Sequence, residues 1–189
     1  WYLPITKSIT LQGVDENGNV ITDASNTQAN VYSTDYSKNG GWPTQSLIFV
    51  FAEDVTIRGL SIMNKVDANK SVEVLNENAG GFTIEHCKFA PIAEGLLPAD
   101  GVKNENGDVV YTYEGYEEYG ASLYFNGSGN SDTISVTENL FEYSGITFDS
   151  TCNGEFVIKR NIFEGEKNWD HDPLYTYSSI GFTSWNNPP

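Results

Sequence analysis

The chain has 189 residues, enough for one domain with a substantial hydrophobic core, and 13% of them are aromatic. Its formal net charge of -16 at pH 7 argues against binding nucleic acid or anionic membranes through simple electrostatic attraction. No stretch approaches the roughly 20 apolar residues that a membrane-spanning helix needs, so we expect no membrane insertion.

Five segments repeat one short pattern of alternating apolar residues, and they start at residues 9, 55, 82, 134 and 156. Each segment has two apolar residues two positions apart and then a bend, and in the last four a further apolar residue follows the bend, as in "ISVTENLF" and "FVIKRNIF". A further alternating segment, such as "SLIFVF", precedes each of the last four. Alternation of this kind predicts short strands with one buried face, and the many Thr, Val, Ile and Phe residues argue against helices.

The repetition itself predicts the fold. Strands that return in the same order in every repeat must stack in parallel on their counterparts, and such self-similarity is typical of stacked repeat architectures. We therefore expect an all-β fold, a single-stranded parallel β-helix (a β-solenoid) of about five coils that forms one domain over residues 1–189. One buried column is expected to contain Ile57, Ile84, Val136 and Ile158.

The bend inside each repeat predicts a second column of residues. Its expected members are Val14, Leu60, Cys87, Asn139 and Asn161. Asparagine tolerates the left-handed backbone conformation that a bend can require, and its amide can hydrogen-bond to the same amide one coil away. We therefore predict a ladder between Asn139 and Asn161. Cys87 is interpreted as a small buried hydrophobe, about two coils from Cys152 and so beyond disulfide reach.

These repeats, with asparagines at the bend, resemble the coils of the right-handed parallel β-helix found in the pectate-lyase-like superfamily. The segment "KSITLQGVDENGNVI" at 7–21 is similar to the opening coil of many members. The resemblance covers nearly the whole chain and implies a right-handed helix. It also implies a piece of a larger bacterial secreted or surface protein, truncated at its N-terminus, although the segment contains no signal peptide. It selects no activity, because the superfamily includes lyases, hydrolases, esterases, tailspikes and adhesins.

Long excursions interrupt the repeats at one corner and alternate there with short connections. They span residues 23–45, 90–120 and 164–177. Insertions on one face of a repeat protein commonly form its binding face. Their aromatic and acidic side chains suit sugars, because rings pack on C–H surfaces while carboxylates accept hydroxyl protons. The candidate ligand-binding residues are Trp42, Tyr113, Tyr116, Trp169, Asp170 and Asp172.

No complete catalytic set can be assigned. Asp170 and Asp172 are the candidates for a catalytic carboxylate pair, as glycoside hydrolysis requires. The resemblance implies further aspartates and a Gly-His-Gly segment for a polygalacturonase-like enzyme, or Arg or Lys beside calcium for a lyase, and neither set is complete. An acidic surface would repel a polyuronate unless calcium intervened. No cofactor is required by the residues, and calcium is the candidate ion for acidic loops such as 100–108.

We expect a secreted or cell-surface module, monomeric and without a nucleic-acid partner. Its function is expected to be binding of carbohydrate, or of a partner on a cell surface, through the loop corner. Two alternatives stay open: part of a polysaccharide lyase or glycoside hydrolase acting on a complex glycan, and a structural spacer or adhesin stalk. The loop aromatics would in the last case serve only to pack the loops onto the solenoid.

Overall fold

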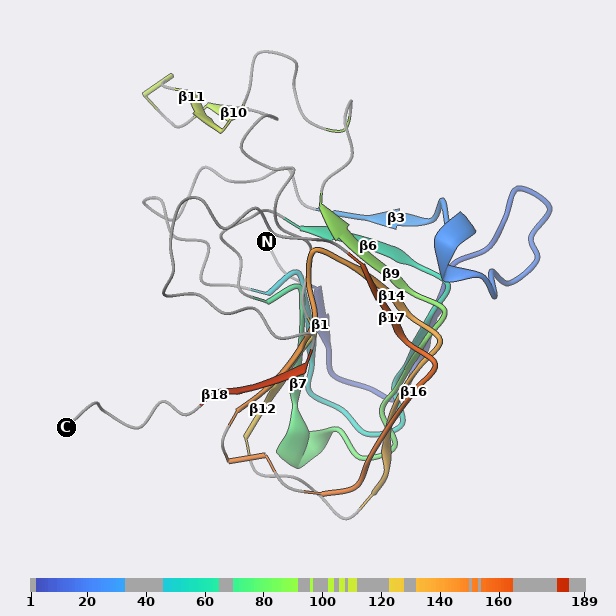
Figure 1. Cartoon of the computed structure of the whole chain (residues 1–189), viewed down its shortest axis with the longest axis vertical. Helices are drawn as coiled ribbons and strands as arrows, with labels where there is room; N and C mark the ends of the chain where they lie inside the picture. Colours follow the sequence, from blue (N-terminus) through green and yellow to red (C-terminus); the bar gives the residue numbers. More distant parts are fainter. Residues whose placement is uncertain are drawn as a thin grey trace.

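The structure is a computed structural model, and it describes residues 3–32, 46–64, 70–91, 96, 102–103, 106–107, 109–111, 123–127, 132–149, 151–152, 154–164 and 180–183. Within these ranges the regular secondary structure is β-strand, apart from two short 3-10 turns, η1 (Ala24–Asn26) and η2 (Asn76–Asn78). Figure 1 shows the strands winding around a common axis and forming three walls.

Each wall is a parallel sheet. The first wall contains, in spatial order, β1 (Leu3–Ile5), β4 (Ile48–Val50), β7 (Val72–Leu75), β12 (Leu123–Asn126), β15 (Ile146–Asp149) and β18 (Ile180–Thr183). The second wall contains β2 (Thr10–Gln12), β5 (Thr56–Arg58), β8 (Thr83–Glu85), β13 (Ile134–Thr137) and β16 (Phe156–Lys159). The third wall contains β3 (Asn30–Val31), β6 (Ser61–Asn64), β9 (Lys88–Pro91), β14 (Leu140–Glu142) and β17 (Ile162–Glu164).

The chain passes from the first wall to the second and then the third before it returns to the first. It repeats this path through five coils, and β18 adds a further strand to the first wall. All neighbouring strands of the three walls pair in parallel, with the counterpart strand one coil away. The expected all-β parallel β-helix of about five coils is therefore confirmed.

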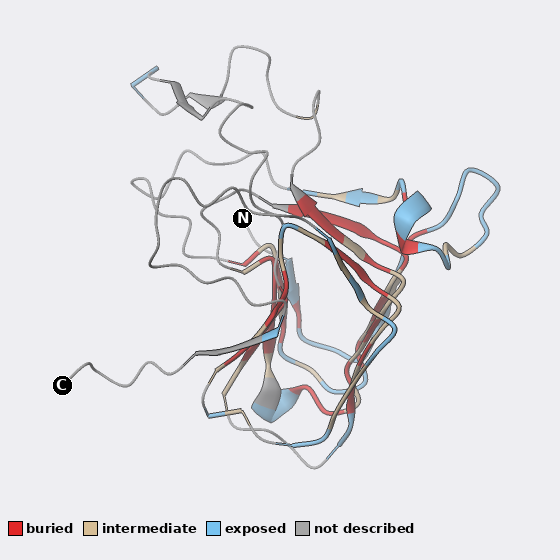
Figure 2. Ribbon diagram, viewed as in Figure 1, coloured by how far each residue is buried: buried red, intermediate tan, exposed pale blue. Residues whose placement is uncertain are grey.

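The predicted register of the second wall is also confirmed. Ile57 pairs with Ile84, Ile84 with Val136, and Val136 with Ile158, while Leu11 extends the column by one coil. The three central members are fully buried. Because side chains alternate between the two faces of a strand, this register sends every second residue into the interior. Figure 2 shows the buried residues following the strands around the axis.

Stacked phenylalanine rings fill the interior behind the third wall. The ring centroids of Phe89 and Phe141 lie 4.6 Å apart, and those of Phe141 and Phe163 lie 4.9 Å apart, with interplanar angles of 9° and 11°. These separations match the spacing of roughly 4.8 Å between paired strands, so identical side chains in register must stack. Each such pair contributes about 0.5–1.5 kcal/mol beyond the area it buries.

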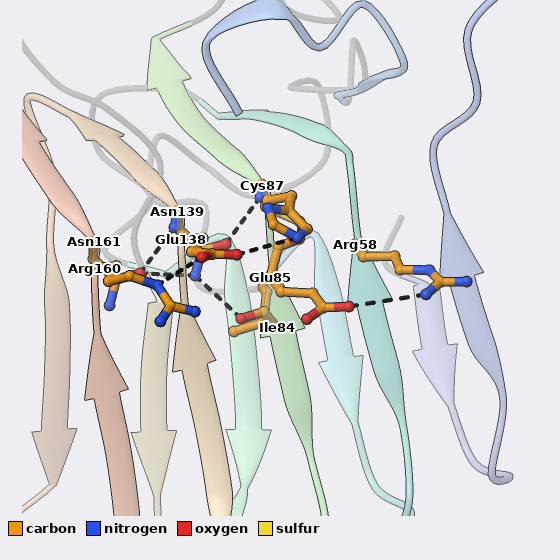
Figure 3. A network of polar contacts seen from close by, with 9 residues as sticks. Arg58, Ile84, Glu85, Cys87, Glu138, Asn139, Arg160 and Asn161 are labelled. Atoms are coloured by element: carbon orange, nitrogen blue, oxygen red, sulfur yellow. Dashed lines mark hydrogen bonds and ion pairs between the residues drawn. The ribbon is translucent and has the colours of Figure 1, made fainter. Parts of the chain in front are cut away.

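The bend between the second and third walls contains the predicted asparagine ladder (Figure 3). The Asn139 amide nitrogen donates to Asn161 Oδ1 at 3.0 Å and to the Ile84 carbonyl at 3.1 Å. Its Oδ1 accepts from the Cys87 backbone N–H at 2.9 Å. Asn139 is buried, with 1% of its surface exposed, so these bonds satisfy polar groups that water cannot reach.

The left-handed backbone conformation lies one residue before the asparagines. His86, Glu138 and Arg160 have φ values of 54°, 57° and 54°, and Gly59 occupies the same place with φ of 63°. The expectation that the asparagines themselves adopt this conformation is therefore wrong. The reason is that the buried amide must face the next coil, which leaves the left-handed turn to the preceding, less buried residue.

Polar and charged side chains form a second ladder on the outside of this bend (Figure 3). Glu138 lies between His86 and Arg160: its Oε2 is 3.3 Å from His86 Nε2, and its Oε1 is 2.6 Å from Arg160 Nε. Arg160 is largely exposed, so this pair is expected to contribute less than about 1 kcal/mol to stability.

The first coil departs from the predicted bend column. Val14 is 45% exposed and forms an antiparallel bridge with Val20. Its expected place is occupied by Ala29, whose carbonyl accepts from the Ser61 N–H at 3.0 Å, as the carbonyl of Leu60 does for the next coil. The assignment of Val14 to this column is therefore wrong, because a local turn extends the bend of the first coil.

Asp15 holds this local turn. Its carboxylate accepts from the backbone N–H groups of Asn17 and Asn19, each at 2.8 Å. Asp23 similarly accepts from the Ser25 N–H at 2.9 Å at the start of η1. These hydrogen bonds lower the pKa of both aspartates, and in each case the largest cause is a side-chain bond, from Asn19 or from Ser25. The turn and η1 together form an excursion between the second and third walls of the first coil.

The connections from the third wall to the first differ in length from coil to coil. Residues 32–47, 92–122 and 165–179 form the longer ones, and residues 65–71 and 143–145 form the shorter ones. The first part of the expected excursion 23–45 contains η1 and β3, so this part belongs to the solenoid and to the preceding bend. Within the second longer connection, β10 (Val102–Lys103) pairs antiparallel with β11 (Val109–Tyr111).

We predict that Val136→Asp lowers the free energy of unfolding by at least about 3 kcal/mol, because it introduces a charge without a counter-ion into the buried column. Ser135→Asp is the control, since its side chain lies on the outer face of the same strand. Denaturant unfolding measures both. Equal effects of the two changes would contradict the register.

We predict that Asn161→Ala lowers the free energy of unfolding by about 1–3 kcal/mol. The Asn161 side-chain oxygen accepts from both the backbone N–H and the side-chain amide of Asn139, and the substitution removes this acceptor. Asn139→Ala should cost more than Asn161→Ala, since it also removes the partner of the buried Cys87 N–H. Chemical denaturation of the two variants side by side tests this order. A silent Asn139→Ala would show that the ladder does not stabilise the bend.

Candidate functional site

The ligand-binding residues expected from the sequence lie outside the described residues. These are Trp42, Tyr113, Tyr116, Trp169, Asp170 and Asp172. The catalytic candidates Asp170 and Asp172 are among them, so both assignments stay predictions. The connections that contain these residues return to the first wall, whose strands are described. This wall carries a cluster of polar and aromatic side chains on its outer face.

The outer face of the first wall is unusually buried. Val72 and Val74 point into the core, so Glu73 between them points outward, yet only 4% of its surface is exposed. Tyr124, its register partner one coil further, also points outward and is 5% exposed. By contrast, the outward residues Thr56 and Arg58 of the second wall are half-buried. The first wall therefore places a charged group in an enclosed, polar setting.

Three donors surround the Glu73 carboxylate. Ser46 Oγ donates to Oε2 at 2.7 Å, and Asn126 Nδ2 donates to Oε1 at 2.8 Å. Lys70 Nζ lies 3.2 Å from the same Oε1 and forms an ion pair with it. A buried carboxylate is tolerated only when it is paired and hydrogen-bonded, and these donors meet that requirement. They come from three different segments of the chain, so the arrangement exists only in the folded solenoid.

Lys70 connects this carboxylate to a second one. Its ammonium lies 3.9 Å from the centroid of the Tyr124 ring, a cation–π contact. The Tyr124 hydroxyl donates to Asp149 Oδ2 at 3.4 Å. The pKa of Asp149 is lowered, first by the hydrogen bond from the Thr151 side chain and also by the positive charge of Lys70. Asp149 is therefore ionised at neutral pH, and the Lys70 ammonium interacts with two carboxylates, those of Glu73 and Asp149.

Two stacked phenylalanines lie beside this polar cluster. Phe49 pairs with Glu73 in the register of the first wall, and Phe51 follows it on the same face. The two ring centroids are 5.2 Å apart with an interplanar angle of 14°, and 36% of the Phe51 surface is exposed. An exposed ring beside carboxylate, amide and hydroxyl groups provides both an apolar surface and polar anchors.

We call this group of side chains the first-wall cluster. Its members are Ser46, Phe49, Phe51, Lys70, Glu73, Tyr124, Asn126 and Asp149. From the sequence, their segments were assigned to strands, and the outward-facing residues were not recognised as a candidate site. The available signal was the residue between the two inward apolar residues: Phe in "IFV", Glu in "VEV" and Tyr in "LYF". Small polar residues are usual at outward positions of an exposed sheet, so a row of large or charged residues could have indicated the cluster.

The cysteines are poor nucleophiles. Both are free thiols, and burial raises the pKa of Cys87 to about 12 and that of Cys152 to about 11. A thiol with so high a pKa is protonated at neutral pH and is unreactive. The interpretation of Cys87 as a small buried hydrophobe agrees with its place in the core.

In the part of the chain that the structure describes, no three His, Cys, Asp or Glu side chains gather as a set of metal ligands. Within the same ranges, no helix has the length and apolar character needed to cross a membrane. The calcium site expected at residues 100–108 falls largely on residues that are not described and stays a prediction.

Comparisons of the chain with protein-family models, with curated proteins and with solved structures found no match. The geometry of the first-wall cluster is therefore the basis for a functional proposal.

We predict that Lys70 and Glu73 are energetically coupled. In a double-mutant cycle of Lys70→Met and Glu73→Gln, the coupling free energy should be about 1–3 kcal/mol, because each single change leaves a polar group without its partner in an enclosed site. Urea unfolding of the four proteins gives this value. The pair Lys88 and Glu142, with its two atoms 2.8 Å apart and both side chains about one quarter exposed, is a suitable comparison and should couple less.

Proposed function

We propose that the protein is an extracellular β-helix module that binds carbohydrate on the outer face of its first wall. The observation that carries this proposal is the exposed Phe51 ring, which stacks on Phe49 on the outer face of the first wall. Phe49, Glu73 and Tyr124 form a row on three adjacent strands of this face, in which Glu73 and Tyr124 are buried. A rigid parallel sheet holds these groups in a fixed geometry, which reduces the entropy lost on binding.

The chemistry of the cluster suits a sugar. Rings such as Phe51 can pack against the C–H face of a pyranose, while carboxylate and amide groups exchange hydrogen bonds with its hydroxyls. Phe51 is its exposed member, with 36% of the residue exposed, and Phe49, Lys70, Asn126 and Asp149 are partly exposed. A ligand would contact these first, and the buried Glu73 would hold Lys70 in place.

The longer connections support the same location. Residues 32–47, 92–122 and 165–179 all return to strands of the first wall, and they contain the aromatic candidates Trp42, Tyr113, Tyr116 and Trp169. In this proposal those side chains add to the binding surface that the first wall begins. The resemblance of the repeats to the pectate-lyase-like superfamily, with its right-handed helix and its many secreted or surface members, is consistent with a glycan ligand outside the cell.

A second candidate function is catalysis on a complex glycan, as a lyase or a glycoside hydrolase. One feature favours it: contacts through Lys70 and Tyr124 connect two carboxylates, those of Glu73 and Asp149. Carboxylates, lysine and tyrosine are the usual general acids and bases for such reactions. Release of reducing ends, or absorbance from an unsaturated product, would support catalysis; binding without either product would support the binding module.

We predict that Phe51→Ala weakens glycan affinity by about tenfold, equivalent to about 1.4 kcal/mol, because it removes the exposed stacking ring. The variant should melt only a few degrees lower, because the lost stacking on Phe49 contributes on the order of 1 kcal/mol and the ring is partly exposed. Ile162→Ala is the matched control: Ile162 is 56% exposed but lies on the third wall. A glycan array followed by titration calorimetry measures both variants. Equal loss of affinity in the two variants, or no effect of Phe51→Ala, would contradict this site.

A further inference from the structure

We infer that the ligand of the first-wall cluster is an uncharged polysaccharide, and that polyuronates are rejected. This inference rests on the proposed function and narrows its ligand class. It depends on where the described charges lie, because a linear polyanion must bring a carboxylate to the site with every sugar unit.

The cluster itself has an excess of negative charge. Glu73 and Asp149 are carboxylates, and Lys70 is the only cation among the described residues of the cluster. Its ammonium is 3.2 Å from Glu73 Oε1, and its charge also lowers the pKa of Asp149. A uronate that approached Lys70 would therefore compete with two carboxylates already in place. Neutral hydroxyl groups meet no such competition.

The neighbouring corner of the solenoid strengthens this effect. In each coil the chain leaves the first wall and turns toward the second, and the charged residues among those described in these turns are mainly acidic. The carboxylates are Glu53, Asp54, Glu77, Asp132 and Glu155, and the single described cation of these turns is Lys7. A polymer lying along the first wall would pass this acidic edge. Charges within about 8 Å of one another interact appreciably at physiological ionic strength.

Apart from Lys7 and Lys70, the cations whose side chains the structure describes lie elsewhere. They are Arg58, Lys88, Lys159 and Arg160, on the second and third walls or at the bend between them. Several are already paired, Arg160 with Glu138 and Lys88 with Glu142. They therefore cannot attract a polyanion to the first wall, which is on another side of the solenoid (Figure 1).

The test is an array of immobilised glycans that contains pairs with one backbone and different charge. Suitable pairs are hydroxyethylcellulose with carboxymethylcellulose, and methyl-esterified galacturonan with polygalacturonate; galactomannan and alginate extend the range. Binding is measured with a chelator present, so that calcium cannot bridge carboxylates. We expect binding to at least one uncharged glycan, unchanged within about a factor of two between about 10 and about 500 mM salt, and binding at least about tenfold weaker to the charged members.

A charge-neutralised variant separates repulsion from shape. Glu53 and Glu77 are exposed and follow β4 and β7, so Glu53→Gln with Glu77→Gln removes negative charge without touching the cluster. Affinity for the uncharged glycan should stay within about a factor of two, because no contact is lost. The weak association with polygalacturonate measured at about 10 mM salt should increase in the variant by at least about twofold.

Three results would overturn the inference. If a polyuronate binds more tightly than its uncharged counterpart, the ligand class is wrong while the binding function stands. If polyuronates bind only after calcium is added, the ion reverses the charge of the site and the inference fails in the same way. If no glycan of either kind binds, the proposed function fails together with it.

Discussion

The stacking of each coil on its neighbours is the interaction on which the rest of this structure depends. A strand as short as Thr83–Glu85 has no stability of its own, and its backbone groups find partners only in the strands one coil away on either side. Because parallel pairing fixes the register, it also fixes which side chains meet. The columns at Ile57 and at Phe89, and the amide ladder at Asn139, all follow from this one geometric constraint.

In the bend between the second and third walls, this constraint gives two adjacent residues different roles. Asn139 turns its amide toward the next coil and saturates buried backbone groups, while Glu138 beside it takes the left-handed conformation and points its carboxylate outward. The left-handed residues of this bend are Gly59, His86, Glu138 and Arg160, so the position accepts quite different side chains. Such tolerance is expected where the backbone is held by two neighbouring coils.

The same rigidity holds the polar side chains on the outer face of the first wall in place. Glu73 could not be buried on a mobile loop without a large desolvation penalty, because its donors must be held in place around it. Lys70 belongs to the same coil as Glu73, whereas Ser46 and Asn126 belong to the two neighbouring coils, and parallel stacking brings these two to the carboxylate. The charge that the solenoid holds there is negative overall, and the proposal of a hydroxyl-rich, uncharged ligand rests on this. Binding and selectivity would thus come from the same scaffold.

The alternation of apolar residues determined the strands, the parallel stacking and the buried column, because a period of two specifies which side chains face a core. The asparagine ladder was equally predictable, since two amides at equivalent places in successive repeats must meet. The tertiary structure alone decided three features. Ala29 replaces Val14 at the bend, because the Asp15 turn is a local structure that no repeat pattern contains. The left-handed position lies at Glu138, since burial of the amide takes precedence over backbone propensity. The enclosure of Glu73 depends on residues from neighbouring coils, and a pattern read along one strand holds no information about them.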